Sequence, residues 1–231
     1  MLTSKTIFRI VVSGAATGLI SFAAPAAAEE TYKAPIRMLN HSRVIGQAEL
    51  VLSDDKSHLT VRIDATGLEP GQQHVGHIHG LVVGNNMPAN SHLPSRAQDT
   101  DNDKYVELAE GAVTYGPILI TLGTDVATPG GDLDPDHDGN IHYQQTFNLE
   151  DSSIYGAGFN KQSVIGDGTE LELREIVIHG LTVPAVGSGT PGEVDGTAGY
   201  KVVLPVAGGE IHGVGKNSND ALRFRYPPKH H

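Results

Sequence analysis

Apolar and polar residues alternate over several short segments of the chain. In the segment HLTVRIDAT, residues 58–66, Leu59, Val61 and Ile63 each sit between polar neighbours. A period of two predicts a β-strand with one buried face and one solvated face. Further segments of this kind begin at Ala48, His74, Gly116, Ile141, Glu170 and Gly199. Because glycines and prolines separate these short segments, we predict an all-β fold, a Greek-key β-sandwich or flattened barrel.

Three long connections separate the predicted strands. They span about residues 81–114, 123–140 and 186–199; the first two are rich in Asp, Asn, Gly and Pro, and the third is rich in glycine. Connections of this length are uncommon unless they carry function. No segment keeps an apolar period of 3.6 residues for more than about three turns, and we expect no convincing helix to flank the acidic segments that begin at Asp99 and Asp134 within the first two connections.

The N-terminal segment resembles a targeting signal. Lys5 and Arg9 precede an apolar run over residues 10–24, and small residues at Ala26 and Ala28 offer a cleavage site before Glu29. These features predict a secretory signal peptide at residues 1–28, so we expect a periplasmic or extracellular protein. The remaining residues, 29–231, suit a single domain with its core at about 36–215 and a disordered tail after about 226. No later segment approaches twenty consecutive apolar residues, and we expect no membrane span.

Charge and composition narrow the classes of ligand. The formal net charge is −11, which disfavours nucleic acid and anionic membrane surfaces and favours cations as ligands. The chain has no cysteine, which excludes disulfides, thiolate metal sites and cysteine nucleophiles. A metal ion would therefore need nitrogen and oxygen ligands. Nothing in the sequence indicates the oligomeric state or a protein or carbohydrate partner.

A short stretch, GLEPGQQHVGHIHG at residues 67–80, holds three of the twelve histidines, His74, His77 and His79. Residues two apart on a strand share a face, with Cα atoms about 7 Å apart, so one metal ion can bridge His77 and His79. Ile78 is then expected in the core, and His74 faces away and is expected to form hydrogen bonds. The alternative is that the H-x-H pair is only polar surface.

Three motifs together resemble the Cu/Zn superoxide dismutase superfamily. They are LTVRIDATGLEPGQQHVGHIHG, LREIVIHGL and GTAGYK, which lie in this order between residues 46 and 211. The resemblance implies a dismutase-like sandwich, copper ligands at His77, His79 and His179, and Lys201 in place of an arginine that guides the substrate superoxide. It leaves only His92, in SHLPS, as a further ligand, and it indicates no zinc site of the usual kind. The motif HIHG followed by acidic segments, the motif YGP and the late motif IVIHG look closer to exported CHRD-domain proteins of bacteria, a group that has the same sandwich and no generally assigned catalytic activity.

Two acidic segments resemble EF-hand calcium loops. The first, DTDNDKYVELAE, places oxygen ligands at Asp99, Asp101, Asp103, Tyr105 (through its carbonyl), Glu107 and Glu110. Its sixth position is Lys104 where the pattern has glycine, and lysine is strained there if φ is positive. The second segment offers Asp134, Asp136, Asp138 and Asn140, has glycine at the sixth position, and lacks the final glutamate. A solvated acidic turn is the alternative for both segments.

Three functional hypotheses follow from these features. The first is a copper-only superoxide dismutase, in which copper exchanges single electrons with superoxide and Lys201 attracts the substrate. The second, which we favour, is an exported metal-binding protein without catalysis, with copper or zinc on the histidines and calcium in one or two loops. The third hypothesis treats the acidic and histidine clusters as ordinary surface residues that bind no ligand. His137 and His142 would complete the transition-metal site only if the second acidic segment folded over the sheet.

Overall fold

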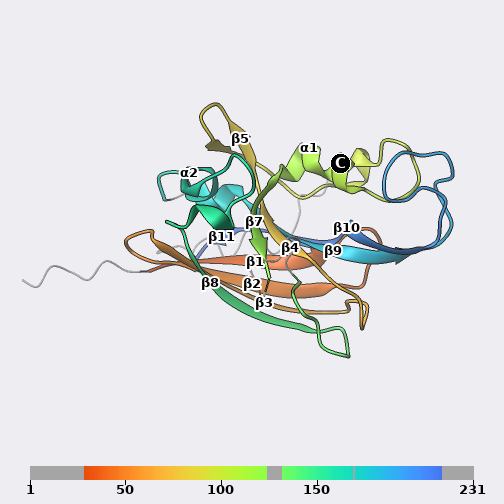
Figure 1. The fold of residues 1–231 in the computed structure, drawn as a ribbon, viewed down its shortest axis with the longest axis horizontal. Coiled ribbons are helices and arrows are strands. Elements are labelled where there is room, and N and C mark those ends of the chain that lie inside the picture. The colour runs from red at the N-terminus through yellow and green to blue at the C-terminus, as the bar shows by residue number, and fades with distance from the viewer. Residues whose placement is uncertain (1–28, 124–131, 169, 215–231) are drawn as a thin grey trace, which may run out of the picture.

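The computed structural model describes residues 29–123, 132–168 and 170–214 (Figure 1). Strands dominate these residues, which confirms the all-β prediction. The strands are β1 (Glu30–Met38), β2 (Ile45–Leu52), β3 (His58–Thr66), β4 (Gly76–His79), β5 (Leu81–Val83), β6 (Met87–Ala89), β7 (Ile118–Leu122), β8 (Ile141–Asn148), β9 (Glu175–Val183), β10 (Gly199–Glu210) and β11 (His212–Gly213). The helical elements are α1 (Leu108–Tyr115), α2 (Lys161–Ile165) and the short 3-10 turns η1 (Arg96–Gln98), η2 (Ser152–Ile154) and η3 (Glu170–Leu173).

The main sheet is antiparallel throughout and curves round on itself. Its strand order in the described residues is β7-β4-β9-β10-β1-β2-β3-β8, with β11 paired to β1. The first part of β1 pairs with β2, and its last residues, Arg37 and Met38, pair with β10. As Figure 1 shows, β9 and β10 therefore lie over β1, β2 and β3, and α1 covers the outer side of this upper layer. A separate hairpin is formed by β5 and β6.

The core lies between the two layers. Leu59, Val61 and Ile63 of β3 are fully buried, as their alternation predicted. From the other layer Ile78 of β4 and Ile176 of β9 join the same apolar cluster. Because successive side chains of a strand point to opposite faces, burial of Ile78 in the core leaves His77 and His79 on the outer face of β4, beneath the layer formed by α1 and the loops.

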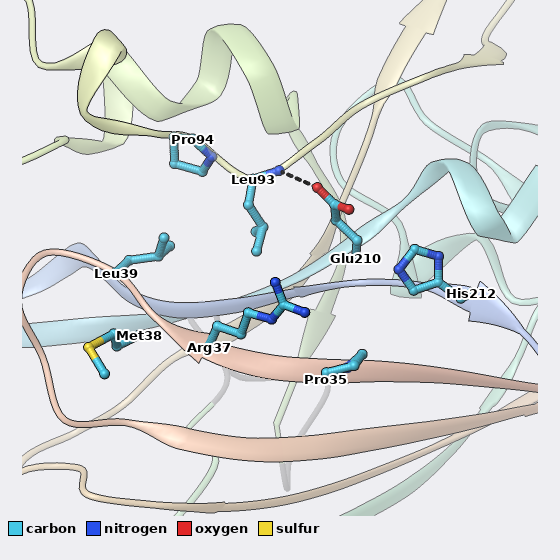
Figure 2. Close-up of a pocket in the computed structure, with 8 residues that line it drawn as sticks. All are labelled: Pro35, Arg37, Met38, Leu39, Leu93, Pro94, Glu210 and His212. Carbon is cyan, nitrogen blue, oxygen red and sulfur yellow. Dashed lines mark hydrogen bonds between the residues drawn. The ribbon is translucent and has the colours of Figure 1, made fainter. Parts of the chain in front are cut away.

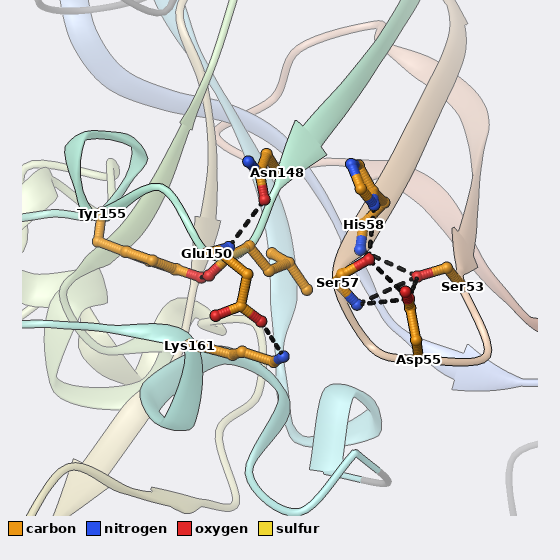
Figure 3. Close-up of polar contacts among 9 residues, drawn as sticks. Ser53, Asp55, Ser57, His58, Asn148, Glu150, Tyr155 and Lys161 are labelled. Carbon is orange, nitrogen blue, oxygen red and sulfur yellow. Dashed lines mark hydrogen bonds and ion pairs between the residues drawn. The ribbon is translucent and has the colours of Figure 1, made fainter.

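Polar contacts fix the turns that connect the lower strands (Figure 3). The Oδ1 atom of Asp55 accepts hydrogen bonds from the Ser53 hydroxyl at 2.8 Å and from the backbone N–H of Ser57 at 3.0 Å, which closes the β2–β3 turn. On the nearby segment after β8, Lys161 forms an ion pair with Glu150 at 2.6 Å. Short polar side chains of this kind commonly replace backbone hydrogen bonds in tight turns.

Strand β1 and the start of β9 differ from the predicted pattern. Strand β1 contains Pro35, and proline normally argues against a strand because it has no N–H to donate. On this edge β1 pairs with β11 at Lys33 and with β10 at Arg37, and Pro35 lies between these two pairings. The segment from Glu170 was predicted as strand, and its first residues instead form η3. The reason is Arg174, whose fully buried guanidinium donates hydrogen bonds to backbone carbonyls of α2 and of the β5–β6 hairpin.

The first long connection is also more structured than expected. It contains β5, β6, η1 and nearly all of α1, so the expectation of no flanking helix was wrong. Helix α1 begins after Glu107 because the Glu110 carboxylate accepts a hydrogen bond from the Glu107 N–H at 3.0 Å, one half of a capping box. None of the helices in the described residues is long and apolar enough to span a membrane. The predicted signal peptide and C-terminal tail lie outside the described residues.

Candidate metal centre

Three histidines from two neighbouring strands converge on one point. His77 and His79 come from β4 and His179 from β9, and one ring nitrogen of each lies within 4.8 Å of those of the other two. The ring centroids are 5.0 Å apart for His77 and His179 and 5.4 Å apart for His77 and His79. All three side chains are buried. The structure therefore brings together the strand pair and the later histidine, and this group, here called the histidine trio, can hold a metal ion.

The trio leaves three ring nitrogens buried without a hydrogen-bond partner among the described residues. They are Nδ1 of His77, Nε2 of His79 and Nε2 of His179. A buried polar atom without a partner costs roughly 1–3 kcal/mol, and such atoms are rare in folded proteins. Three of them within ligand distance of one another fit a bound metal ion, whose coordination bonds would offset this cost.

The other nitrogens of two trio members are held by backbone carbonyls. The Nδ1 atom of His79 lies 2.9 Å from the Gly116 carbonyl oxygen, and that of His179 lies 2.7 Å from the Val203 carbonyl oxygen. Because a carbonyl only accepts, Nδ1 carries the proton in both rings and Nε2 keeps its lone pair. This is the arrangement by which metal-binding histidines are commonly oriented.

The burial of the trio also favours its neutral form. Loss of hydration, together with repulsion from His179, lowers the pKa of His77 to about 2 and that of His79 to about 3. Burial lowers the pKa of His179 to about 4. Since only a neutral imidazole nitrogen binds a metal ion, the fold presents these ligands ready to bind over the whole neutral pH range.

Tyr115, the last residue of α1, packs against the histidine trio. The centroid of its ring lies 4.6 Å from that of His79 in an edge-on contact. The Tyr115 hydroxyl donates a hydrogen bond to the Leu108 carbonyl oxygen at 3.1 Å, so its proton is used within α1. Tyr115 was not singled out in the sequence, because its contact with His79 depends on how the first long connection folds.

The remaining histidines with predicted roles lie elsewhere. His92 is exposed, and its backbone N–H donates to the Thr114 carbonyl at 3.2 Å. The side chains of His137 and His142 are exposed, and His142 lies against the Asp64 carboxylate. None of the three contributes a nitrogen to the trio. His74 is buried with its ring nitrogens 3.1 and 3.2 Å from backbone carbonyl oxygens, which confirms its expected hydrogen-bonding role.

Lys201 lies near the start of β10, and its charge is engaged locally. The Nζ atom donates hydrogen bonds to the Thr197 hydroxyl at 2.9 Å and to the Asp195 carboxylate at 3.3 Å. The Lys201 side chain is only 16% exposed. Between Lys201 and Pro205 the pairing of β10 with β9 is shifted by a bulge, and this irregular stretch contains Val203, whose carbonyl holds His179.

The first acidic segment forms a second candidate group, here called the aspartate trio. Carboxylate oxygens of Asp99, Asp101 and Asp103 lie within 4.8 Å of one another. One oxygen of each is buried without a hydrogen-bond partner among the described residues, and Asp103 as a whole is only 6% exposed. Lys104 adopts a φ of 84°, so the sixth position takes the left-handed conformation that the loop pattern requires in spite of its side chain. Hard oxygen ligands in this arrangement suit Ca²⁺.

The other predicted ligands of this loop make backbone contacts. Tyr105 donates its N–H to Asp103 at 2.8 Å. Glu110 accepts from the Thr100 N–H at 2.6 Å as well as capping α1. Glu107 is almost fully buried, and its Oε1 accepts from the Val194 N–H at 2.6 Å. Burial, and then repulsion from neighbouring carboxylates, raises the pKa of Glu107 to about 7.

The second acidic segment forms a tight turn. Both carboxylate oxygens of Asp136 accept hydrogen bonds, one from the backbone of Asp138 and Asn140 and the other from the Asn140 side chain. Gly139 has a φ of 77°, and a Cβ atom there would lie 2.1 Å from the Leu68 carbonyl oxygen, so this glycine is needed for packing. Asp134 and the other acidic residues of this turn do not form a converging group in the described structure.

A surface pocket of about 420 Å³ lies apart from both groups (Figure 2). Arg37 and Glu210 face it, and the Leu93 N–H donates to the Glu210 carboxylate across its rim at 3.4 Å. No member of either trio lines this pocket. The two trios therefore carry the chemistry that the described residues offer most clearly.

No model of a known family matches the chain, and no curated protein matches it.

Proposed function

We propose that this chain is an exported metal-binding protein whose histidine trio holds a copper or zinc ion. The observation that carries the proposal is the convergence of three buried, unpaired ring nitrogens. Imidazole ligands suit Cu²⁺ and Zn²⁺, and they do not suit Ca²⁺ or Mg²⁺. The aspartate trio offers only oxygen, so calcium is its proposed ion. The histidine trio thus suits a transition-metal ion, and the aspartate trio suits a hard cation.

The assignment to the dismutase-like superfamily, close to the CHRD-domain proteins, belongs to this proposal. It is supported by the antiparallel sandwich and by the meeting of His77 and His79 with His179, which the order of the motifs implied. The signal-like residues 1–28 support export to the periplasm or the exterior.

A copper-only superoxide dismutase is the second candidate, and the all-imidazole trio favours it. Bound copper would supply one-electron exchange with superoxide. The contacts of Lys201 weigh against it, because Asp195 neutralises the charge that would attract the anion. The net charge of −11 also repels superoxide at long range. We therefore favour metal binding without catalysis.

Metal titration of the purified chain tests the proposal. We expect one Zn²⁺ or Cu²⁺ per chain in calorimetry, with the binding lost in His179→Gln. The matched control is His137→Gln, which removes an exposed histidine outside the trio. Superoxide dismutation is then assayed on the copper-loaded chain, where activity that falls in His179→Gln would establish the enzyme. Binding that persists in His179→Gln would overturn the assignment of the site.

A further inference from the structure

The two trios are joined by helix α1. The aspartate trio lies in the loop that leads into α1, and Glu107 is the N-cap residue of the helix. At the other end Tyr115 packs against His79, and the Gly116 carbonyl oxygen accepts from the Nδ1 atom of His79 at 2.9 Å. An eight-residue helix moves as one unit, so a shift at its first turn is transmitted to its last residue. The position of the loop therefore sets the position of a group that orients a metal ligand.

The connection between β9 and β10, residues 184–198, joins the same two places by a second route. Its Glu193 carboxylate accepts from the Leu108 N–H at 3.1 Å, and its Val194 N–H donates to Glu107 at 2.6 Å. The connection continues into β10, where the Val203 carbonyl oxygen accepts from the Nδ1 atom of His179 at 2.7 Å. The segment that holds His179 in orientation is thus tied to the end of the calcium-type loop.

Two glycines let this connection approach the acidic groups closely. At Gly187 a Cβ atom would lie 3.1 Å from the unpaired carboxylate oxygen of Asp103, and at Gly192 it would lie 2.0 Å from a carboxylate oxygen of Glu107. Both glycines have positive φ, 72° and 125°. The approach brings Glu193 into a region that already contains Asp103 and Glu107, both nearly fully buried. Like charges in so small a volume repel one another, and the repulsion opposes closure of the connection unless a cation is present.

We propose that a divalent cation of the calcium type, bound by Asp99, Asp101 and Asp103, fixes α1 and the 184–198 connection and thereby tightens metal binding by the histidine trio. The inference rests on the proposed function of the histidine trio. The buried, unpaired oxygen of Asp103 points to a ligand in the acidic loop independently of the loop pattern. The carbonyls of Gly116 and Val203 are the groups through which the cation acts. Gly116 and Val203 are positioning residues, because they contact the ligands and not the metal ion.

The test compares Zn²⁺ affinity of the metal-free full chain with and without saturating Ca²⁺, by calorimetry. The same titration on His179→Gln supplies the blank for zinc that binds outside the trio. We expect Ca²⁺ to raise the Zn²⁺ affinity by roughly 5- to 150-fold, and Zn²⁺ to raise the Ca²⁺ affinity by the same factor, because coupling between sites is reciprocal. The effect should disappear in Asp101→Asn and persist in Asp138→Asn, which removes an exposed carboxylate of the second acidic segment.

A second readout follows the 184–198 connection directly. Cleavage after Glu193 by a glutamyl endopeptidase should slow when Ca²⁺ binds, and a purely local calcium site would leave it unchanged. A Zn²⁺ affinity that stays within twofold on Ca²⁺ binding overturns the coupling and leaves the zinc site intact. A chain that binds no Ca²⁺ but still binds Zn²⁺ at the trio overturns the inference alone, whereas loss of Zn²⁺ binding itself overturns the proposed function. The comparison on the unmodified chain needs no variant, so it stands even where Asp101→Asn fails to fold.

Discussion

The hydroxyl of Ser91 lies 2.6 Å from the Oε2 atom of Glu175 and 2.5 Å from the Leu173 carbonyl oxygen. A serine hydroxyl has one proton to donate, and a carbonyl oxygen has none. Both contacts are hydrogen bonds only when the second proton comes from Glu175, so the geometry indicates a protonated carboxyl group. Burial acts in the same direction and raises the pKa of Glu175 to about 8. Glu175 pairs with His79 across β4 and β9, so an uncharged carboxyl group lies beside the histidine trio.

The protonation of Glu175 predicts how stability depends on pH. In the folded chain Glu175 keeps its proton up to about pH 8, while the unfolded chain loses it near the ordinary value of 4.5. The folded state therefore binds more protons between these values, and its stability falls as pH rises, by about 1.4 kcal/mol per pH unit. Glu175→Gln is uncharged at every pH, so its free energy of unfolding should rise relative to that of the unmodified chain by about 1.4 kcal/mol per pH unit between pH 5 and 8. Urea unfolding of the metal-free protein measures this difference. Glu150→Gln, an exposed control, should show no such gain; parallel profiles for the two variants would contradict the prediction.

The carbonyl of Gly116 predicts a second measurable effect. Gly116 has a φ of 78°, and a Cβ atom there would lie 2.3 Å from the Gly80 carbonyl oxygen. Gly116→Ala should therefore displace the carbonyl that orients His79 and lower the metal affinity of the trio by about 10- to 100-fold. Gly158→Ala is the matched control, since Gly158 also has a positive φ but nothing lies within 4 Å of its Cβ position. Equal losses in metal affinity for both variants would show that backbone strain, and not the carbonyl, controls binding.

The two acidic segments predict a calcium stoichiometry of one. The aspartate trio leaves three buried oxygens free to bind, whereas Asp136 uses both of its oxygens in hydrogen bonds within its turn. Calorimetry should find about one Ca²⁺ per chain, which is abolished by Asp101→Asn and retained in Asp136→Asn. Two equivalent calcium ions, or retention of binding in Asp101→Asn, would refute this assignment.

The sequence predicted those features of the site that depend on local periodicity. Alternation along β4 was enough to place His77 and His79 on one face and Ile78 in the core, and the structure agrees. The meeting with His179 needs the pairing of β4 with β9, which lies about a hundred residues away and entered only through the resemblance. Lys104 is a second case in which the local pattern was not sufficient. The pattern asks for glycine at this position, but the loop has a lysine with positive φ there.

Features that depend on loops and bulges were out of reach of the sequence. The bulge in β10 aims the Val203 carbonyl at His179, and no side-chain pattern marks it. Tyr115 reaches His79 only because α1 folds across the outer face of the upper layer. His92 illustrates the converse, since its place in the order of motifs suggested a ligand while the fold leaves it exposed. Long-range placement of this kind follows from the packing of the whole connection and not from any local propensity.

The unpaired Nδ1 atom of His77 predicts opposite effects of one substitution with and without metal. In the metal-free chain this atom is buried without a partner among the described residues, so His77→Leu removes a polar group whose hydration was lost on folding. The variant should be as stable as the unmodified chain or more stable, by up to about 1–3 kcal/mol.

With Zn²⁺ at about a hundred times its dissociation constant, the unmodified chain gains about 2.7 kcal/mol from binding, and the variant gains little because one of three ligands is missing. Urea unfolding should therefore find His77→Leu at least as stable as the unmodified chain without Zn²⁺ and less stable than the unmodified chain with Zn²⁺. The exposed control His137→Leu should gain as much stability from Zn²⁺ as the unmodified chain does. A His77→Leu chain that is less stable than the unmodified chain in the absence of metal would contradict this prediction. It would mean that His77 stabilises the fold itself.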